Sequence, residues 1–390
     1  MRISQAIYLD HQATTPVDPR VFAEMAPYFA KVFGNPHSVE HVFGWESSQA
    51  VEAAAATIGG LIGADADEII FTSGATEANN LALLGLGRRA ALGNRRRVLV
   101  GATEHKSVLA ASRALQEQLG YEVQYLPVDE KGFIDLSVLE CSLSEDVLLV
   151  SIAPVNNEIG TIQDIAAISE MARTSGTLLH CDGAQAPCAI DLHTIAEFAD
   201  LLSLSAHKIY GPKGIGALYI SREFQARIEP LIYGGGQQGN LRSGTVPVAL
   251  CVGMAAATML LNSSDVQIER ERLRERTKSF IQHVQDLGRP VFLNGPEDAR
   301  RHPGNANLRF EGFEAQSILS TLQPHLAAST GSACTSGIPE PSHVLRAVGL
   351  TTDQAEASIR FSLGRETTDD DIETAVGLID DALARLSRKI

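Results

Sequence analysis

The sequence predicts an α/β protein: a mostly parallel central sheet with helices on both faces, joined to a smaller α+β domain. Short, continuous apolar runs such as 147–152 and 199–204 are typical of strands that are buried on both faces. Helix-like or polar segments separate these runs, and this alternation favours parallel strands with helical crossovers. After about residue 262 a charged helix and shorter strands follow, which indicates the second domain.

The elements of the large domain can be taken in chain order. Asp18 is expected to cap a helix that continues to about Phe29, and an alanine-rich helix is expected over 46–62. Further helices are expected after the turn at Gly74 and from Val108. The predicted strands are 68–72, 97–100, 122–126, 147–152, 177–181 and 199–204.

The second domain is predicted from a change in character rather than from a linker. A helix over 265–287 carries a run of charges that is typical of a solvated face, and the last helix places apolar residues on one stripe. We therefore expect a large domain over 16–261 and a small domain over 1–15 plus 262–390. The strands expected in the small domain are 290–293, 306–310 and 358–362.

Charge and hydropathy exclude several kinds of partner. The 390 residues carry a net charge of −15, which argues against direct binding to nucleic acid or to an anionic membrane surface. The apolar run at the N-terminus is too short for a signal peptide, and no later run approaches the length of a membrane span. We therefore expect a cytoplasmic protein with no membrane partner.

The cysteines do not predict a disulfide framework or a metal site. There are five of them, an odd number in a chain without an export signal. His180, Cys181 and Asp182 form a possible ligand cluster, but adjacent side chains of a strand point to opposite faces and cannot converge on one ion. No metal is predicted.

Polar residues gather where the predicted strands end. In an open α/β sheet, ligands bind at the carboxyl ends of the strands, so these residues are candidates for one shared site. A single polar residue at a strand end is usually structural, but together these five ends supply phosphate donors, an imidazole, a carboxylate, amides and an amine. They are 73–76 including Ala75 and Thr76, His105, 156–158 including Asn157, Asp182 with Gln185, and 205–208 with Ser205, His207 and Lys208.

Lys208 would explain most of this group. It follows a predicted buried strand, and desolvation lowers the pKa of an amine, so that it can form a Schiff base with a carbonyl cofactor such as pyridoxal phosphate. Asp182 ends the preceding strand and could keep the pyridine nitrogen protonated. Thr76 follows a glycine turn at a helix start, which suits a phosphate. The structural alternatives are a solvated lysine, a simple helix cap and, for His105, a core histidine.

Two further residues stand apart from the strand ends. Cys334 lies in a loop of small residues over 329–337; most lone cysteines are small buried hydrophobes, but an exposed polar loop favours a nucleophilic thiolate. Asn35 belongs to a turn and could offer its amide to a ligand, although most such residues only shape the turn.

Taken together, the chain resembles a cysteine desulfurase of the NifS/IscS type, a class V aminotransferase-like enzyme of fold type I that uses pyridoxal phosphate. The resemblance runs nearly end to end. The motifs that carry it are Tyr8-Leu9-Asp10, Ala13-Thr14-Thr15-Pro16, Phe71-Thr72-Ser73-Gly74-Ala75-Thr76-Glu77, Thr103-Glu104-His105, Val155-Asn156-Asn157-Glu158-Ile159-Gly160, Ser205-Ala206-His207-Lys208, Arg242-Ser243-Gly244-Thr245, Gly331-Ser332-Ala333-Cys334 and Ile359-Arg360-Phe361-Ser362.

The resemblance implies a role for each candidate residue. Lys208 would bind the cofactor and remove the substrate Cα proton, His105 would stack on the ring, and Cys334 would accept the sulfur. The remaining roles are Asp182 at the pyridine nitrogen, Gln185 at the ring oxygen, Ala75, Thr76, Ser205 and His207 at the phosphate with Thr245 from the other subunit of a homodimer, and Arg360 with Asn157 and Asn35 at the substrate carboxylate.

The implied reaction converts L-cysteine to L-alanine, forms a persulfide on Cys334 and passes the sulfur to an acceptor protein. The sequence closes at Ile390 without the C-terminal extension by which housekeeping members dock the iron–sulfur scaffold. The acceptor therefore stays open among iron–sulfur or nitrogenase cluster assembly, tRNA thiolation and DNA phosphorothioation.

Two alternatives remain at this point. A selenocysteine lyase or another class V aminotransferase would share the cofactor site, but transamination has no use for Cys334. A sulfur-carrier or interaction subunit would keep the fold without turnover, which the intact Lys208, Asp182 and His105 disfavour.

Overall fold

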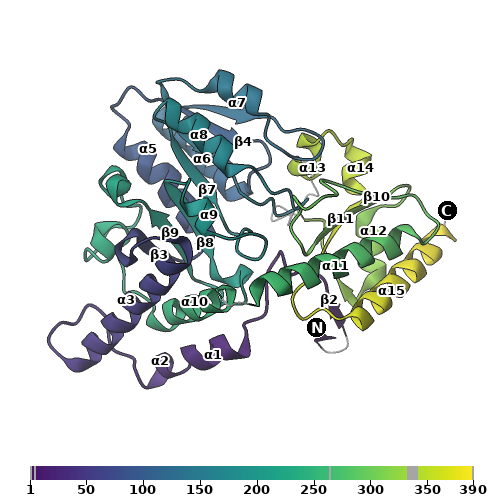
Figure 1. Ribbon diagram of the computed structural model, residues 1–390, viewed down its shortest axis with the longest axis horizontal. Helices are drawn as coiled ribbons and strands as arrows, with labels where there is room; N and C mark the ends of the chain where they lie inside the picture. The colour runs from purple at the N-terminus through teal and green to yellow at the C-terminus, as the bar shows by residue number, and fades with distance from the viewer. Residues whose placement is uncertain (1, 4–5, 263–264, 332–340, 389–390) are drawn as a thin grey trace.

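The computed structural model describes residues 2–3, 6–262, 265–331 and 341–388 (Figure 1). Its centre is a seven-stranded sheet in the order β3-β9-β8-β7-β6-β4-β5. The strands are β3 (Ile69–Thr72), β4 (Arg97–Gly101), β5 (Glu122–Leu126), β6 (Val147–Ser151), β7 (Leu178–Asp182), β8 (Leu201–Ser205) and β9 (Gly216–Ile220).

The prediction of a mostly parallel sheet is confirmed. From β8 to β5 every neighbouring pair is parallel, whereas β9 runs antiparallel to both of its neighbours, β3 and β8. The sequence analysis did not include β9, which is a five-residue apolar run directly after a glycine-rich turn. It inserts β3 into the sheet and so brings the end of β3 to the edge where β8 ends.

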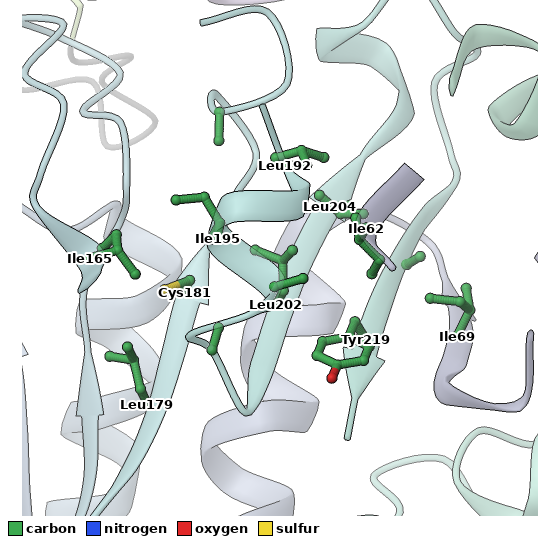
Figure 2. Close-up of a cluster of buried hydrophobic side chains, with 14 of the residues drawn as sticks. Ile62, Ile69, Ile165, Leu179, Cys181, Leu192, Ile195, Leu202, Leu204 and Tyr219 are labelled. Carbon is green, nitrogen blue, oxygen red and sulfur yellow. The ribbon is translucent and has the colours of Figure 1, made fainter. Parts of the chain in front are cut away.

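Both faces of this sheet are buried, which explains the continuous apolar strands. Leu99 of β4 packs with residues of α3 (Val42–Ile62), α8 (Ile165–Thr174) and α9 (His193–Ala196) on one face. Val98 and Val100 pack with α5 (Leu86–Arg89) and α6 (Lys106–Leu119) on the other. Figure 2 shows the first cluster, in which Leu179 and Cys181 of β7 lie beside Leu202 and Leu204 of β8.

The alternation that argued against a metal at 180–182 is therefore present. Cys181 joins the apolar cluster, whereas His180 lies on the opposite face between two hydroxyls. Its ring nitrogens bond to Ser151 Oγ at 2.8 Å and to Ser203 Oγ at 3.1 Å. Burial lowers the pKa of His180 to about 4, so it is a neutral core histidine.

Several helix boundaries differ from those predicted. The first helix is two, α1 (Pro19–Met25) and α2 (Pro27–Ala30), because Pro27 has no N–H with which to continue the hydrogen-bond ladder. The Asp18 cap is confirmed, since its side chain accepts from the Arg20 N–H. Helix α3 begins before residue 46, and α6 begins at Lys106 with His105 as its cap. The helix after Gly74 is α4 (Ala75–Asn80), which continues through a π-helical turn at Leu81–Gly85 into α5.

The rest of the chain forms two small sheets against long helices. One sheet contains β1 (Arg2–Ile3), β2 (Ala6–Tyr8) and β12 (Leu326–Ala327), and the other β10 (Val291–Leu293), β11 (Asn305–Phe310) and β13 (Ser358–Ser362). Figure 1 shows α11, α12 and α15 gathered on this side of the molecule. The remaining helices are α7 (Leu136–Ser142), α10 (Val248–Leu261), α11 (Val266–Gln285), α12 (Ala315–Leu322), α13 (His343–Ala347), α14 (Thr352–Glu356) and α15 (Asp369–Ser387).

The division into domains at residues 16 and 262 stays a prediction, although the small sheets have a core of their own. The apolar stripe expected on the last helix is part of this core: Ile372, Ile379 and Leu383 of α15 are buried in it, and Val376 and Leu386 pack against it. Within the described residues, no one helix has the length and apolar composition to cross a membrane; α10 and α11, bent by 78°, meet that test only as a pair.

Phe280 is the aromatic centre of the small core and provides a test of it. The side chain is fully buried, and its ring meets Phe361 edge to face at 5.2 Å between centroids. We expect Phe280→Ala to lower the free energy of unfolding by about 3–5 kcal/mol, because it leaves a cavity. Equilibrium urea denaturation measures this.

Phe292 is the matched control, since it is 45% exposed on β10. Phe292→Ala should cost less than about 1 kcal/mol. Equal losses for the two variants would contradict the packing described here.

Candidate functional site

A cavity of about 1330 Å³ opens at the carboxyl ends of the central strands and faces the small sheets. It collects most of the residues that the sequence singled out, from both ends of the chain. Those that line it are Ala75, Thr76, His105, Asn157, Asp182, Gln185, Ser205, His207, Lys208 and Arg360. The predicted convergence of the strand ends is therefore found.

Lys208 is held at the centre of this cavity by backbone oxygens. It ends a short 3₁₀ turn, Ala206–Lys208, that directly follows β8. Its Nζ donates to the carbonyls of Gln12 at 2.6 Å and Ala13 at 2.9 Å. Burial lowers the pKa of the amine to about 8, and the positive charge of Arg360 acts in the same direction. The amine is therefore about half neutral near pH 8, well below the pH at which an ordinary lysine loses its proton.

Asp182 ends the neighbouring strand, because β7 pairs with β8. Its carboxylate is buried and receives two donors: the Asn79 Nδ2 at 2.7 Å and the Ala184 N–H at 3.1 Å. Gln185 donates through Nε2 to the Gln12 carbonyl at 2.9 Å, so one backbone oxygen contacts both the amide and the lysine. These contacts place a carboxylate, an amide and an amine around one space.

His105 borders the same space as the cap of α6. Its Nδ1 accepts from the Ser107 N–H at 3.1 Å and lies 2.8 Å from Ser107 Oγ. Burial lowers its pKa, while the Asp182 carboxylate acts in the opposite direction. The ring is neutral at physiological pH.

The sequence analysis missed Asn79, which contacts both Asp182 and Ser107. A signal was available, since Asn79 lies three residues after Thr76 and so shares a helix face with it.

Two strand ends form a cup of small polar groups at one side of the cavity. Ser73 and Gly74 precede α4, which begins with Ala75 and Thr76. Ser205 is the last residue of β8, and His207 follows it in the 3₁₀ turn. The turn is tight: a Cβ at Gly216 of β9 would lie 2.7 Å from the Gly74 Cα. Burial lowers the pKa of His207 to about 4, and its Nδ1 lies 3.1 Å from Thr14 Oγ1. The cup thus consists of neutral hydrogen-bonding groups.

Arg360 of β13 lines the opposite side of the cavity, where its guanidinium is hydrogen-bonded to other residues of the chain. Its Nη2 donates to Asp10 Oδ1 at 2.8 Å and to Ser329 Oγ at 3.0 Å. Its Nη1 donates to the Asn157 carbonyl at 2.8 Å, so Asn157 contacts Arg360 through its backbone. The guanidinium joins three distant parts of the chain at the rim of the cavity.

Three predicted residues are not brought to this cavity by the described residues of one chain. Asn35 lies in an exposed turn, where its Oδ1 accepts from the His37 N–H at 3.0 Å. Thr245 is exposed ahead of α10. Cys334 lies outside the described residues, but Gly331 and Pro341, at the two ends of the 332–340 segment, both line the cavity.

Comparison with known proteins agrees with this geometry. Residues 7–374 match the family model described as aminotransferase class-V. A relative from Rickettsia bellii (strain OSU 85-389), named cysteine desulfurase IscS, is 46% identical over 374 residues, which cover 96% of this chain and 90% of the relative.

Solved structures give the same result. A NifS-like protein superposes with a TM-score of 0.90 at 31% identity and covers 97% of this chain and 99% of its own. SspA, solved in complex with cysteine, has a TM-score of 0.80 at 32% identity and covers 93% and 100%. The chain therefore belongs to the class V aminotransferase family and, within it, to the cysteine desulfurases.

Proposed function

We propose that this chain is a pyridoxal phosphate-dependent enzyme that converts L-cysteine to L-alanine and passes the sulfur, as a persulfide on Cys334, to an acceptor protein. The observation that carries the proposal is the placement of Lys208, with its lowered pKa, beside the buried carboxylate of Asp182 in one cavity. Membership of the cysteine desulfurases, and the cysteine bound in the SspA structure, support L-cysteine as the substrate.

The donor set of the cavity fits this cofactor. The Asp182 oxygens accept one hydrogen bond each and retain lone pairs for a protonated pyridine nitrogen. Space is open beside Gly74, where a Cβ would meet nothing within 4 Å. Lys208 would hold the carbonyl carbon, Gln185 the ring oxygen, and Ala75, Thr76, Ser205 and His207 the phosphate. When bound, the cofactor supplies a sink for the electrons released at the substrate Cα.

The chain's own residues would divide the remaining work. Lys208, neutral in part near pH 8, accepts the Cα proton of the substrate. Arg360 binds the substrate carboxylate together with Asn157, and we expect it to exchange one of its present partners to do so. L-cysteine and the Cys334 thiol then become L-alanine and a Cys334 persulfide, and atoms and electrons balance without another reactant.

A homodimer would complete the cavity. Asn35 and Thr245 are exposed and do not line the cavity of their own chain, so we propose that each reaches the cavity of a partner subunit. Exposed aromatic residues lie on both sides of Asn35 along the chain, and we call them the aromatic patch. It consists of Phe22, Phe29, Phe33, Phe43 and Trp45, each between 48% and 67% exposed. Phe33 lies between α2 and α3, and the others lie on α1, α2 and the start of α3 at the lower edge of Figure 1. So much exposed aromatic surface is typical of a protein interface.

The proposed dimer interface can be tested at the aromatic patch. Phe33 and Phe43 stack at 5.8 Å between ring centroids, so a charge at Phe33 would be placed within the aromatic patch. We expect Phe33→Asp with Trp45→Asp to give a monomer by light scattering, and activity to fall by about tenfold or more because positioned groups are lost.

Leu92→Asp is the control for this experiment, because Leu92 is fully exposed outside the aromatic patch. It should remain dimeric and active. If the double variant still dimerises, the aromatic patch is not the interface. A fully active monomer would contradict the proposal that residues of a partner subunit complete the cavity.

The lowered pKa of the Lys208 amine can be tested by chemical labelling. Because the pKa of Lys208 is lowered to about 8, the amine is charged below this pH and becomes neutral above it. In the full-length protein stripped of cofactor, labelling of Lys208 by acetic anhydride should be half-maximal near pH 8. In urea-unfolded protein the same peptide should follow the ordinary lysine value of about 10.4. Quantitative mass spectrometry measures both, and indistinguishable profiles would contradict the lowered pKa.

Replacement of Cys334 tests the function itself. Cys334→Ala should retain the visible absorbance of the bound cofactor but lose sulfur transfer to a thiol acceptor, because the attacking thiolate is missing. Cys141→Ala, at an exposed cysteine elsewhere, is the control and should transfer sulfur normally. Alanine and sulfide are both quantified.

The outcomes separate the alternatives. Unchanged sulfur transfer in Cys334→Ala would remove the persulfide role. Alanine production that depends on added pyruvate would indicate an aminotransferase, and a preference for selenocysteine would indicate a lyase. A wild-type protein without turnover would indicate an interaction subunit.

A further inference from the structure

A chain of hydrogen-bonded side chains runs below the cavity from Asp182 to His105. Asn79 Nδ2 lies 2.7 Å from Asp182 Oδ2 and 2.9 Å from Ser107 Oγ, and Ser107 Oγ lies 2.8 Å from His105 Nδ1. Asn79 is completely buried, and Asp182 and Ser107 are nearly so. Water therefore does not compete for these bonds, and their directions are set by the side chains themselves.

The directions follow from the carboxylate. An ionised carboxylate only accepts, so the amide nitrogen of Asn79, not its oxygen, must face Asp182. That nitrogen carries two hydrogens, and the second one points to Ser107 Oγ. The amide oxygen is left without a hydrogen-bond partner among the described residues. An unpaired, fully buried amide oxygen costs free energy, so we infer that the two hydrogen bonds donated by Nδ2 are what Asn79 contributes to the site.

The chain of bonds determines which ring nitrogen of His105 carries the proton. Ser107 Oγ accepts from Asn79, so its own hydrogen is available for His105 Nδ1. The Ser107 backbone N–H also donates to Nδ1, at 3.1 Å. Two donors at one nitrogen require that it carry no hydrogen, so the proton of the neutral ring is on Nε2.

We propose that Asn79 is a positioning residue that couples Asp182 to His105 through Ser107, and that it makes His105 present an Nε2–H donor to the cavity. His105 then orients substrate atoms as a hydrogen-bond donor, while the proton at Cα goes to Lys208. This division of labour rests on the proposed function, but the state of the His105 ring does not. The titratable groups that act on the ring, Asp182, Lys208, His343 and Lys106, belong to four different elements.

The ring can be observed directly in the full-length protein. With ¹⁵N-labelled histidine, one of eleven sets of ring signals belongs to His105 and disappears in His105→Gln. We expect a protonated Nε2 and an unprotonated Nδ1 at pH 7.5. A proton on Nδ1, or on both nitrogens, would overturn the proposal.

A double-mutant cycle tests the coupling. Donors at Nδ1 favour the neutral ring, so Ser107→Ala and Asn79→Ala should each raise the pKa of His105 by about 0.5 to 1. Because Asn79 acts on the ring through Ser107, the double variant should shift the pKa no further than the larger single change. Additive shifts would show that Asn79 acts independently and would overturn the coupling.

Ser112→Ala is the matched control, since Ser112 is a buried serine of the same helix whose hydroxyl, among the described residues, bonds only to the Val108 carbonyl, at 2.8 Å. It should leave the pKa of His105 unchanged. If Asn79→Ala does not fold, the comparison of Ser107→Ala with Ser112→Ala still decides whether the hydroxyl acts on the ring, and equal pKa values would overturn the proposal.

The hydrogen bond from Asn79 to Asp182 is tested separately, by the affinity for the cofactor. Asn79→Ala removes a hydrogen bond to the Asp182 carboxylate and should weaken binding of pyridoxal phosphate by roughly tenfold or more. Ser107→Ala leaves that bond in place and should change the affinity by less than about twofold. An equal loss of cofactor affinity in both variants would overturn the assignment of separate roles to the Asn79–Asp182 bond and to the path through Ser107. Failure of the cysteine reaction would leave all of these binding and NMR results unaffected, so the two proposals are tested separately.

Discussion

The parallel pairing of β7 with β8 is the constraint on which the site depends. It places Asp182 and Lys208 at the same edge of the sheet, although more than twenty residues separate them in the chain. The apolar sides of both strands, Leu179 with Cys181 and Leu202 with Leu204, are fixed in one buried cluster. The positions of Asp182 and Lys208 are therefore determined by the packing of apolar side chains that do not themselves line the cavity.

The N-terminal segment closes the cavity and connects it to the small sheets. The carbonyls of Gln12 and Ala13 accept from Lys208, while the Gln12 side chain accepts from Asn305 of β11 at 2.7 Å. Asp10, two residues earlier, pairs with Arg360 of β13. One short segment thus contacts the lysine, the arginine and the second core, so a displacement of the small sheets would reach the amine directly.

Much of the architecture could be predicted from the sequence because burial on both faces leaves continuous apolar strands. The carboxyl ends of those strands then identified Lys208, Asp182 and His105. The antiparallel β9 was missed, since a five-residue apolar run does not reveal its direction. Asn79 was missed because its spacing to Thr76 indicates only a shared helix face, and its two partners, Asp182 and Ser107, are brought to it by the fold. Asn35 and Thr245 are exposed and do not line the cavity of their own chain, so their predicted roles there remain predictions.

The close approach of Gly216 to Gly74 has a mechanical consequence. The two backbones touch, so the turn that begins α4 rests on a strand that is hydrogen-bonded on both sides. A turn held only by its own residues can flex, whereas this one moves only if the sheet deforms. The stiffness of the cup is thus a property of β9, and a side chain added at position 216 would push on the cup from behind without entering it.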